Sequence, residues 1–465
     1  MPIFAPLNSE PVPLLQQIEV ATFFQLPSFQ IIGLPSPEVT EARERIRSAI
    51  EASGFEFPRK RVVLNLSPAS IRKRGTGLDL AMALAVLGVD QPSRRRVAAW
   101  AELGLDGILK PAGQLTRTIF AAWQGQVSHL LVSQAEYSLA LQAFQCVRNG
   151  AEVPGTPPLL VPVRTLLEAW NFTSTDFIEF SVLENFDEGP MRGAESTSPP
   201  PHPSLSLLPL SPALERMVGI SVAGHHHFLL LGPRGTGKSH ALEWLTHLYP
   251  GLSPFDHFQR QMVSEIWQNK TQQALSSVRR VSAQVKAGAL TGGATAWAIR
   301  PGEYSLAHGG LLLADELPEW SRDSRESLRE PLERGKVTIT RAQGSFELPA
   351  QFLLAANGNL CPCGGIPPGL SSSVPPGVAS YDSEKGKKEY QKNLLCRCSH
   401  SMRRNYLGKL SGPILDRMDL VAMLLTPAAN EKRESASSEV ELRKRIEFTR
   451  QSLEKRWGKL SGLLS

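Results

Sequence analysis

The sequence lacks a long apolar run, and cysteine is scarce in it. No uninterrupted hydrophobic stretch approaches the roughly 20 residues that a membrane-spanning helix needs. The N-terminal residues MPIFAPLNSEPVPLL have no basic segment ahead of an apolar one, which argues against a signal peptide. Five cysteines in 465 residues do not suggest a disulfide scaffold. We therefore expect a cytoplasmic protein without a membrane partner.

A large excess of charge is also absent. Hydrophobic residues make up 42% of the chain and charged residues 20%, which is enough apolar material for two or three ordinary domains. The formal net charge of +6 is compatible with an anionic partner such as DNA. Because many proteins with so small an excess bind no polyanion, charge by itself does not indicate nucleic-acid binding.

The chain does contain a complete phosphate-binding loop. The sequence LLLGPRGTGKSH, residues 229–240, is a buried-strand run that leads into the pattern G-x-x-x-x-G-K-[ST] without a mismatch. Glycines let backbone N–H groups turn toward a polyphosphate, and the helix that follows presents its positive end to the same charge. The pattern therefore predicts an ATP site formed by Gly232, Pro233, Arg234, Gly235, Thr236, Gly237, Lys238 and Ser239.

An acidic pair later in the chain supplies the second part of such a site. The apolar run at residues 311–314 ends in Asp315 and Glu316. One carboxylate at the end of such a strand can hold Mg²⁺ while the other polarises the attacking water. We expect Lys238 to contact the β- and γ-phosphates. Ser239 and Asp315 are then the expected magnesium ligands, and Glu316 is the expected catalytic residue.

A linker divides the chain. Residues 187–212, DEGPMRGAESTSPPPHPSLSLLPLSP, are rich in proline, serine and glycine, as extended linkers are. We expect an N-terminal domain at 1–180, a linker at 181–212, a nucleotide-binding domain at 213–430 and a helical segment at 431–465. A predicted strand at 61–66 and a predicted buried helix at 78–87 indicate that the N-terminal domain is mixed α/β.

Long motifs in both domains resemble one family. The segment GLPSPEVTEARERIRSAIEASGFEFPRKRVVLNLSPASIRKRGTGLDLAMALAVLG and the later ELGLDGILKPAG resemble the N-terminal domain of the ComM/YifB family, the magnesium-chelatase-like AAA+ ATPases. RPGEYSLAHGGLLLADELPEW, SLREPLERGKVTITRA, CPCG and LSGPILDRMDL follow in the family's order. The resemblance covers most of residues 17–425. Chelatase subunits, which insert magnesium into porphyrins, share the core but not this N-terminal domain.

The resemblance implies a fold and an activity. It implies a Lon-protease-like α/β domain followed by an AAA+ P-loop domain. It also implies a hexameric, ATP-driven helicase that acts on single-stranded or branched DNA and promotes branch migration in natural transformation. A Lon-like fold raises the question of proteolysis, which needs a serine in the turn before the buried helix. That turn reads RGTG at residues 74–77, so we expect no protease activity.

The resemblance assigns two further residues to the ATPase site. The family has an asparagine just before its CPCG motif that orients the attacking water, and Asn359 matches it best, with Asn357 as the competitor. Arg417 matches the family's arginine finger, which stabilises charge on the γ-phosphate in a neighbouring subunit. The alternative for Arg417 is an ion pair with Asp416 or Asp419.

Basic residues offer candidate DNA contacts. The clusters at residues 59–61, 72–74 and 94–96 are either solvated faces or a surface that contacts phosphates. After a helix predicted at 324–334, residues 337–344 predict a hairpin similar to the one that ring helicases of this clade insert into their pore. Arg341 near its tip either contacts a phosphate or is an ordinary exposed charge.

Four cysteines form two close pairs. Four thiolates match the ligands of a tetrahedral structural zinc, although C-x-C pairs are less diagnostic than C-x-x-C pairs. The alternatives are free reduced thiols or His400 as a substitute ligand. Three consecutive histidines at 225–227 point in different directions from a strand and are poor candidates for one ion. The candidate zinc ligands are Cys361, Cys363, Cys396 and Cys398.

Parts of the family pattern are missing. Paired histidines are expected in a segment before the acidic strand, where residues 277–283 read SVRRVSA, and the linker replaces the family's segment ahead of the phosphate loop. Beyond residue 430 we expect one helix with a capping box at Ser438 to Glu441, and no sensor 2 arginine motif precedes Ser465. The main alternative is therefore a divergent, C-terminally short paralogue that binds nucleotide and regulates a partner without moving DNA.

Overall fold

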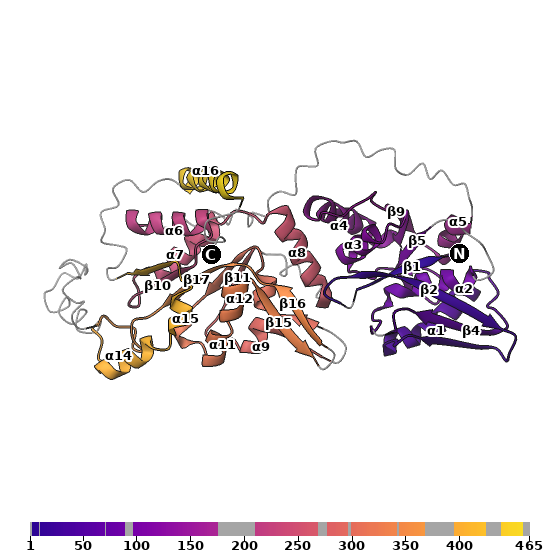
Figure 1. The fold of residues 1–465 in the computed structure, drawn as a ribbon, viewed down its shortest axis with the longest axis horizontal. Coiled ribbons are helices and arrows are strands. Elements are labelled where there is room, and N and C mark those ends of the chain that lie inside the picture. The colour runs from indigo at the N-terminus through magenta and orange to yellow at the C-terminus, as the bar shows by residue number, and fades with distance from the viewer. Residues whose placement is uncertain are drawn as a thin grey trace.

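A computed structural model shows two α/β halves that lie side by side (Figure 1). It describes residues 2–8, 10–69, 71–88, 96–174, 210–267, 277–295, 299–341, 344–367, 395–424 and 439–458. Nearly all of the predicted linker, and Ser438 of the predicted capping box, lie outside these ranges. We call residues 2–174 the N-terminal half and residues 210–458, which contain the predicted ATP site, the ATPase half. None of the helices in the described ranges has the length and hydropathy needed to cross a membrane.

A mixed seven-stranded sheet forms the centre of the N-terminal half. Its strand order is β3-β4-β2-β1-β5-β8-β9. The strands are β1 (Ile3–Leu7), β2 (Leu14–Phe23), β3 (Ser28–Ile32), β4 (Arg61–Leu66), β5 (Val97–Trp100), β8 (His129–Ser133) and β9 (Leu159–Val163), with a small hairpin of β6 (Glu102–Leu103) and β7 (Leu109–Lys110).

Helices cover both faces of this sheet. One core cluster joins the sheet to α1 (Pro37–Ala52), α2 (Asp79–Leu87) and α5 (Leu166–Ser174). A second core cluster, on the opposite face, joins it to α3 (Leu115–Gln124) and α4 (Tyr137–Gly150). Every second residue of β4 is buried, as the pleat of a strand requires, and the first eight residues of α2 are all buried. Both predicted elements, at 61–66 and 78–87, are therefore confirmed.

The ATPase half is built on a parallel five-stranded sheet. Its order is β11-β14-β17-β10-β18, and every neighbouring pair is parallel. All residues of β10 and β14 are buried, as expected for parallel strands covered on both faces. The strands are β10 (Phe228–Leu231), β11 (Val278–Val281), β14 (Leu311–Ala314), β17 (Leu353–Gly358) and β18 (Leu420–Met423).

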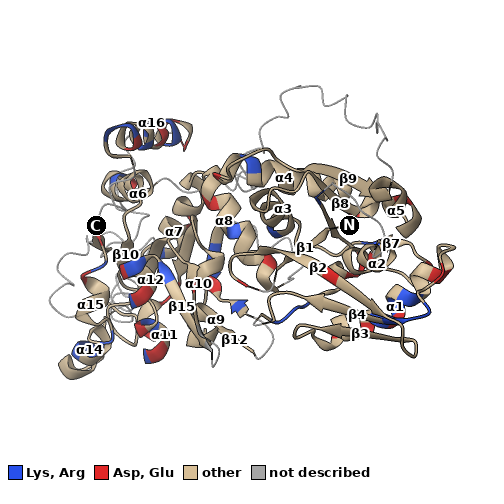
Figure 2. Ribbon diagram, turned by 45° about the vertical axis from the view of Figure 1, so that its right-hand side comes forward, with Lys and Arg blue, Asp and Glu red and all other residues tan. Residues whose placement is uncertain are grey.

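The helices of the ATPase half surround this sheet. They are α6 (Pro212–Gly224), α7 (Lys238–Leu248), α8 (Pro254–Ser264), α9 (Ala287–Thr291), α10 (Glu303–Leu306), α11 (Arg322–Glu326), α12 (Arg329–Arg334), α14 (His400–Leu407), α15 (Gly412–Leu415) and α16 (Glu439–Trp457). Helix α16 packs on α6 and carries charges of both signs (Figure 2). Two short pairs complete the half: β12 (Gly292–Ala294) with β13 (Ile299–Pro301), and β15 (Lys336–Arg341) with β16 (Gly344–Pro349).

One predicted boundary is wrong. The sequence predicted a single helix at 324–334, but the structure has two short helices, α11 and α12, with Ser327 and Leu328 between them. Pro331 has no N–H to donate to the carbonyl of residue 327, so a continuous helix would lose a hydrogen bond there. The predicted hairpin is present as β15 and β16. Its tip residues 342 and 343, and the side chain of Arg341, lie outside the described part of the chain.

Helix α8 and the turn after it join the two halves. The half-buried carboxylate of Glu265 accepts hydrogen bonds from the backbone N–H groups of Thr116 (3.2 Å) and Arg117 (3.0 Å), in the first turn of α3. The Arg117 guanidinium donates in return to the Met262 carbonyl at 2.8 Å. Phe258 of α8 packs in the same core cluster as α3 and α4. The junction is therefore both apolar and hydrogen-bonded.

The Glu265 contacts lead to a testable expectation. First-turn N–H groups have no partner within their own helix, so Glu265→Ala leaves those of Thr116 and Arg117 without an acceptor. Their hydrogen exchange should become faster by about tenfold or more, since bonds to a charged acceptor contribute roughly 1.5–3 kcal/mol. Hydrogen–deuterium exchange measures this directly, with Glu447→Ala on the exposed side of α16 as the control. Unchanged exchange at these two amides would show that Glu265 does not hold the junction.

Candidate nucleotide and metal sites

The phosphate-binding loop connects β10 to α7. Gly235 and Gly237 adopt left-handed backbone conformations, with φ of 77° and 89°. A residue with a Cβ is strained there, so the local backbone requires glycine. Helix α7 begins at Lys238, directly after the Gly237 cap, and Ser239 in its first turn is exposed. The sequence prediction of a strand, a glycine-rich loop and a helix is therefore confirmed at this position.

Lys238 lies over the loop. Its Nζ donates to the carbonyls of Gly232 (2.7 Å) and Pro233 (2.6 Å) and to Oδ1 of Asn359 (3.2 Å). Burial lowers the pKa of Lys238 to about 8, while the Glu316 carboxylate opposes that shift. Neutral oxygens thus solvate a half-buried ammonium. A polyphosphate would offer it charged acceptors, which form stronger hydrogen bonds.

The acidic pair follows β14, and an asparagine connects it to the neighbouring strand. Asn357 Nδ2 donates to Asp315 Oδ1 at 2.8 Å, and the Glu316 N–H donates to Asn357 Oδ1 at 2.7 Å. Glu316 has a left-handed backbone with φ of 50°. The side chain of Asn357 therefore fixes the backbone that follows β14. It does so at Glu316, whose left-handed conformation is unfavourable for a residue other than glycine.

The strand order explains how these groups meet. Strand β17 lies between β10 and β14, so residues at its carboxyl end face the ends of both neighbours. Asn357 contacts the acidic pair on one side, and Asn359 contacts Lys238 on the other. The two asparagines that competed in the sequence thus have different contacts. The assignment of Asn359 as the water-orienting residue stays a prediction.

Arg417 lies away from its own phosphate loop. It precedes β18, whose first residue Leu420 pairs with Phe228 at the start of β10, whereas the loop follows the end of β10. Its guanidinium donates to Glu333 Oε1 at 2.8 Å, and 43% of its side chain is exposed. The carboxylate of Asp419, one of the alternative partners, accepts instead from the His227 N–H. Sequence reasoning missed Glu333, because no spacing signal links it to Arg417.

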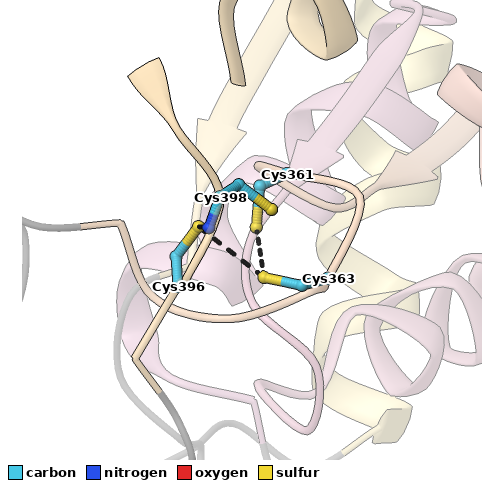
Figure 3. Close-up of side chains that lie close together, drawn as sticks. All are labelled: Cys361, Cys363, Cys396 and Cys398. Carbon is cyan, nitrogen blue, oxygen red and sulfur yellow. Dashed lines mark hydrogen bonds between the residues drawn. The ribbon is translucent and has the colours of Figure 1, made fainter. Parts of the chain in front are cut away.

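The four cysteines converge (Figure 3). All four sulfur atoms lie within 4.8 Å of one another. Four sulfurs at about 2.3 Å from one zinc ion would lie roughly 3.8 Å apart, so the cluster fits a tetrahedral Cys₄ site. Among the residues that the structure describes, this group has the geometry for a metal, and His400 is not part of it. The predicted set of Cys361, Cys363, Cys396 and Cys398 is therefore one cluster, while the identity of the metal stays a prediction.

The consecutive histidines at residues 225–227 show no sign of a metal site. His227 Nδ1 accepts from the Leu354 N–H at 3.1 Å, and burial lowers its pKa to about 4. Burial also lowers the pKa of His225 to about 3. Both rings therefore stay uncharged at neutral pH, and they lie just before β10 in the chain. No metal-binding group with these histidines is found among the described residues.

Residues 361–365, which carry Cys361 and Cys363 and which we call the cysteine loop, contact the phosphate-binding loop. The Arg234 N–H donates to the Gly364 carbonyl at 2.8 Å, and the Gly232 N–H donates to the Gly358 carbonyl at 3.1 Å. A Cβ on Gly364 would approach the Arg234 side chain to 2.5 Å. The Cys361 thiol contacts the Gly365 carbonyl, and Gly364 lies between these two residues. The cysteine cluster therefore fixes the Gly364 carbonyl, which accepts the hydrogen bond from Arg234 in the phosphate-binding loop. The sequence did not predict this contact.

A double substitution tests the cysteine cluster. If it holds zinc, wild-type protein should carry about one equivalent, and Cys361→Ser with Cys396→Ser should carry none. Nucleotide affinity should also fall by about fivefold, the effect of one lost hydrogen bond, because the Gly364 carbonyl is no longer fixed. Metal analysis of protein purified without chelators and titration with an ATP analogue measure both effects, with Cys146→Ser as control. A metal content near zero with four freely titrating thiols would exclude a metal site.

Comparisons with known proteins show which proteins the chain is similar to. The model of a family described as "Magnesium chelatase, subunit ChlI" matches residues 211–375 and 378–432, and the model of "Subunit ChlI of Mg-chelatase" matches residues 18–136. The chain is 28% identical to the Competence protein ComM of Haemophilus influenzae, over 97% of this chain and 82% of that protein.

Two further relatives show the same extent of similarity. The chain is 30% identical to the uncharacterized protein YifB of Salmonella typhimurium, over 98% of this chain and 82% of the relative. It is 31% identical to an uncharacterized protein of Mycobacterium tuberculosis, over 95% and 80%. The matches span both halves, the phosphate loop and the cysteines. The chain therefore belongs to the ComM/YifB family of magnesium-chelatase-like AAA+ ATPases.

Proposed function

We propose that the protein hydrolyses ATP with Mg²⁺ where the phosphate loop meets the acidic pair. The observation that carries this proposal is the position of β17. Asn357 in this strand contacts Asp315 on one side, and Asn359, just after the strand, contacts Lys238 on the other. A nucleotide between these groups would have its charge met by backbone N–H groups and one ammonium.

Each residue has a proposed role. Lys238 binds the β- and γ-phosphates, and Ser239 and Asp315 hold Mg²⁺, whose charge offsets that of the phosphates. Glu316 activates the attacking water and Asn359 orients it. Asn357 positions the acidic pair through its hydrogen bonds to Asp315 and to the Glu316 N–H.

We propose that the active form is a hexameric ring, as in the helicases that the chain resembles. Arg417 and the phosphate loop lie at opposite ends of the parallel sheet, so Arg417 does not reach the nucleotide of its own chain. An exposed guanidinium there can enter the site of a neighbouring copy. Its bond to Glu333 is exposed and is therefore easily exchanged for a phosphate contact.

We propose DNA as the substrate of the motor. The motif resemblance, the competence protein among the relatives and the hairpin β15–β16 support this choice. Arg341 ends β15 and is the proposed phosphate contact of that hairpin. The alternative, a nucleotide-binding regulator, requires tight ATP binding without turnover.

Two substitutions separate nucleotide binding from chemistry. Lys238→Ala should weaken ATP binding by about 10- to 100-fold, because it removes a charged donor to the ground-state phosphates. Glu316→Gln should largely retain ATP affinity and lower turnover by roughly 100-fold or more, because its main effect is on the attacking water. Equilibrium titration with ATP and steady-state ATPase assays distinguish the two. Wild-type protein that binds ATP tightly and never hydrolyses it would favour the regulator instead.

Mixing two variants tests the ring. Arg417→Ala should lower ATPase activity by about 1,000-fold while ATP binding is retained, as expected for an arginine finger. Adding Lys238→Ala protein should restore part of that activity, because intact Arg417 then meets an intact phosphate loop across subunits. The assay is run with and without forked DNA, which should stimulate wild-type turnover. A protein that stays monomeric with ATP and does not respond to DNA would contradict the proposed motor.

A further inference from the structure

The turn between β2 and β3 exposes large apolar side chains. Phe24 is 91% exposed, Leu26 is 89% exposed and Phe23 is 46% exposed. Single exposed apolar residues are common, but three within four positions of one tight turn are an apolar patch. We call residues 23–27, together with Arg59, Lys60 and Arg61, the N-terminal tip. Folding does not bury this patch within the chain.

Two cations lie against these rings. Lys60 Nζ is 4.4 Å from the centroid of the Phe24 ring, and the Arg61 guanidinium is 6.0 Å from that of Phe23. Such contacts fix the position of a cation but leave its charge in place. The tip therefore presents aromatic faces and positive charge together.

The acceptors at the tip are mainly neutral. Arg61 donates to the amide oxygens of Gln25 at 3.0 Å and of Gln30 at 3.2 Å. Arg59 faces Glu56 at 3.9 Å, and both side chains are 86% exposed, so this ion pair contributes little. The guanidinium of Arg61 is thus held in place by amides, and its charge remains available to an anion.

The position of the tip leaves it accessible. Strand β3 is at the edge of the sheet and β4 is its neighbour, and the two lie together along one side of the N-terminal half (Figure 2). In Figure 1, β4 lies on the opposite side of that half from α8 and the ATPase half. The tip therefore does not belong to the junction between the two halves.

We propose that the N-terminal tip binds single-stranded nucleic acid, with a base stacked on Phe24 and backbone phosphates at Lys60 and Arg61. A single strand offers what the tip can recognise, namely unpaired aromatic faces and regularly spaced negative charges. A duplex stacks its bases on one another and leaves no free face. The proposal rests on the proposed function, since it assumes a protein that works on DNA, and it adds a second contact far from the ATPase site.

The two parts of the tip should affect binding in different ways. Phe24→Ala removes stacking, so it should weaken binding of a single strand by roughly 5- to 100-fold without changing the salt dependence. Phe24→Trp keeps a stacking ring and should restore the affinity. Lys60→Ala removes one phosphate contact, so it should lower the slope of log affinity against log salt by about 0.7. A residue with only a structural role would not produce this split.

The experiment uses the full chain with an ATP analogue. Fluorescence anisotropy measures binding of a labelled oligothymidine and of a duplex of the same length, over a range of salt concentrations. Leu105→Ala, at a turn of the same half where the side chain is 61% exposed, is the matched control and should leave binding unchanged. Single-strand binding that is roughly 5- to 100-fold weaker in Phe24→Ala, with duplex binding unchanged, is the expected result.

Other outcomes overturn the proposal in distinguishable ways. If Phe24→Ala binds the oligothymidine as wild type does, while forked DNA still stimulates the ATPase, the tip is not a DNA contact and the motor stands. If the wild type binds neither oligothymidine nor forked DNA, the motor and the tip proposal fail together. If Phe24→Ala changes sedimentation but not DNA binding, the tip is a contact between copies of the chain.

Discussion

Charge compensation for the polyphosphate that we propose as ligand accounts for the layout of the ATPase half. The charge has to be met by backbone N–H groups and one ammonium in a space free of bulky side chains, so the loop from Gly232 to Ser239 ends a buried strand and begins a helix. The acidic residues that we propose to hold the metal must reach the same point. A parallel sheet provides this, because the carboxyl ends of β10, β14 and β17 lie along one edge.

Strand β17, the central one of these three strands, connects the phosphate loop to the acidic pair. Asn357, in β17, contacts the acidic pair, and Asn359, just after β17, contacts Lys238. Any movement of β17 would therefore change both contacts. The cysteine loop follows this strand directly and holds the Gly364 carbonyl against the Arg234 N–H. Strand β17 and the cysteine loop therefore restrain the phosphate loop together.

Helix α8 connects this site to the other half of the protein. Arg260 on α8 donates to the carbonyls of residues 307 and 308, just ahead of β14, while Glu265 after it binds the first turn of α3. A short path of hydrogen bonds thus runs from the N-terminal half to the base of the strand that ends in the acidic pair. The Arg260 contacts are buried and the Glu265 contacts are half-buried, so breaking one leaves a polar group without its partner, at a cost in free energy.

The sequence by itself determined what depends on neighbours in the chain. The phosphate loop, the acidic strand, the buried helix of the N-terminal half and the two cysteine pairs are local patterns, because glycine conformations and the periods of strands and helices act over a few residues. The break between α11 and α12 was missed, although it also has a local cause in Pro331. What only the tertiary structure decided are contacts between distant segments. Lys238 and Asn359 are 121 residues apart, Arg417 and Glu333 are 84 apart, and Arg117 and Glu265 are 148 apart. No periodicity encodes such pairs, since they follow from the order of strands in a sheet and from the packing of helices on it.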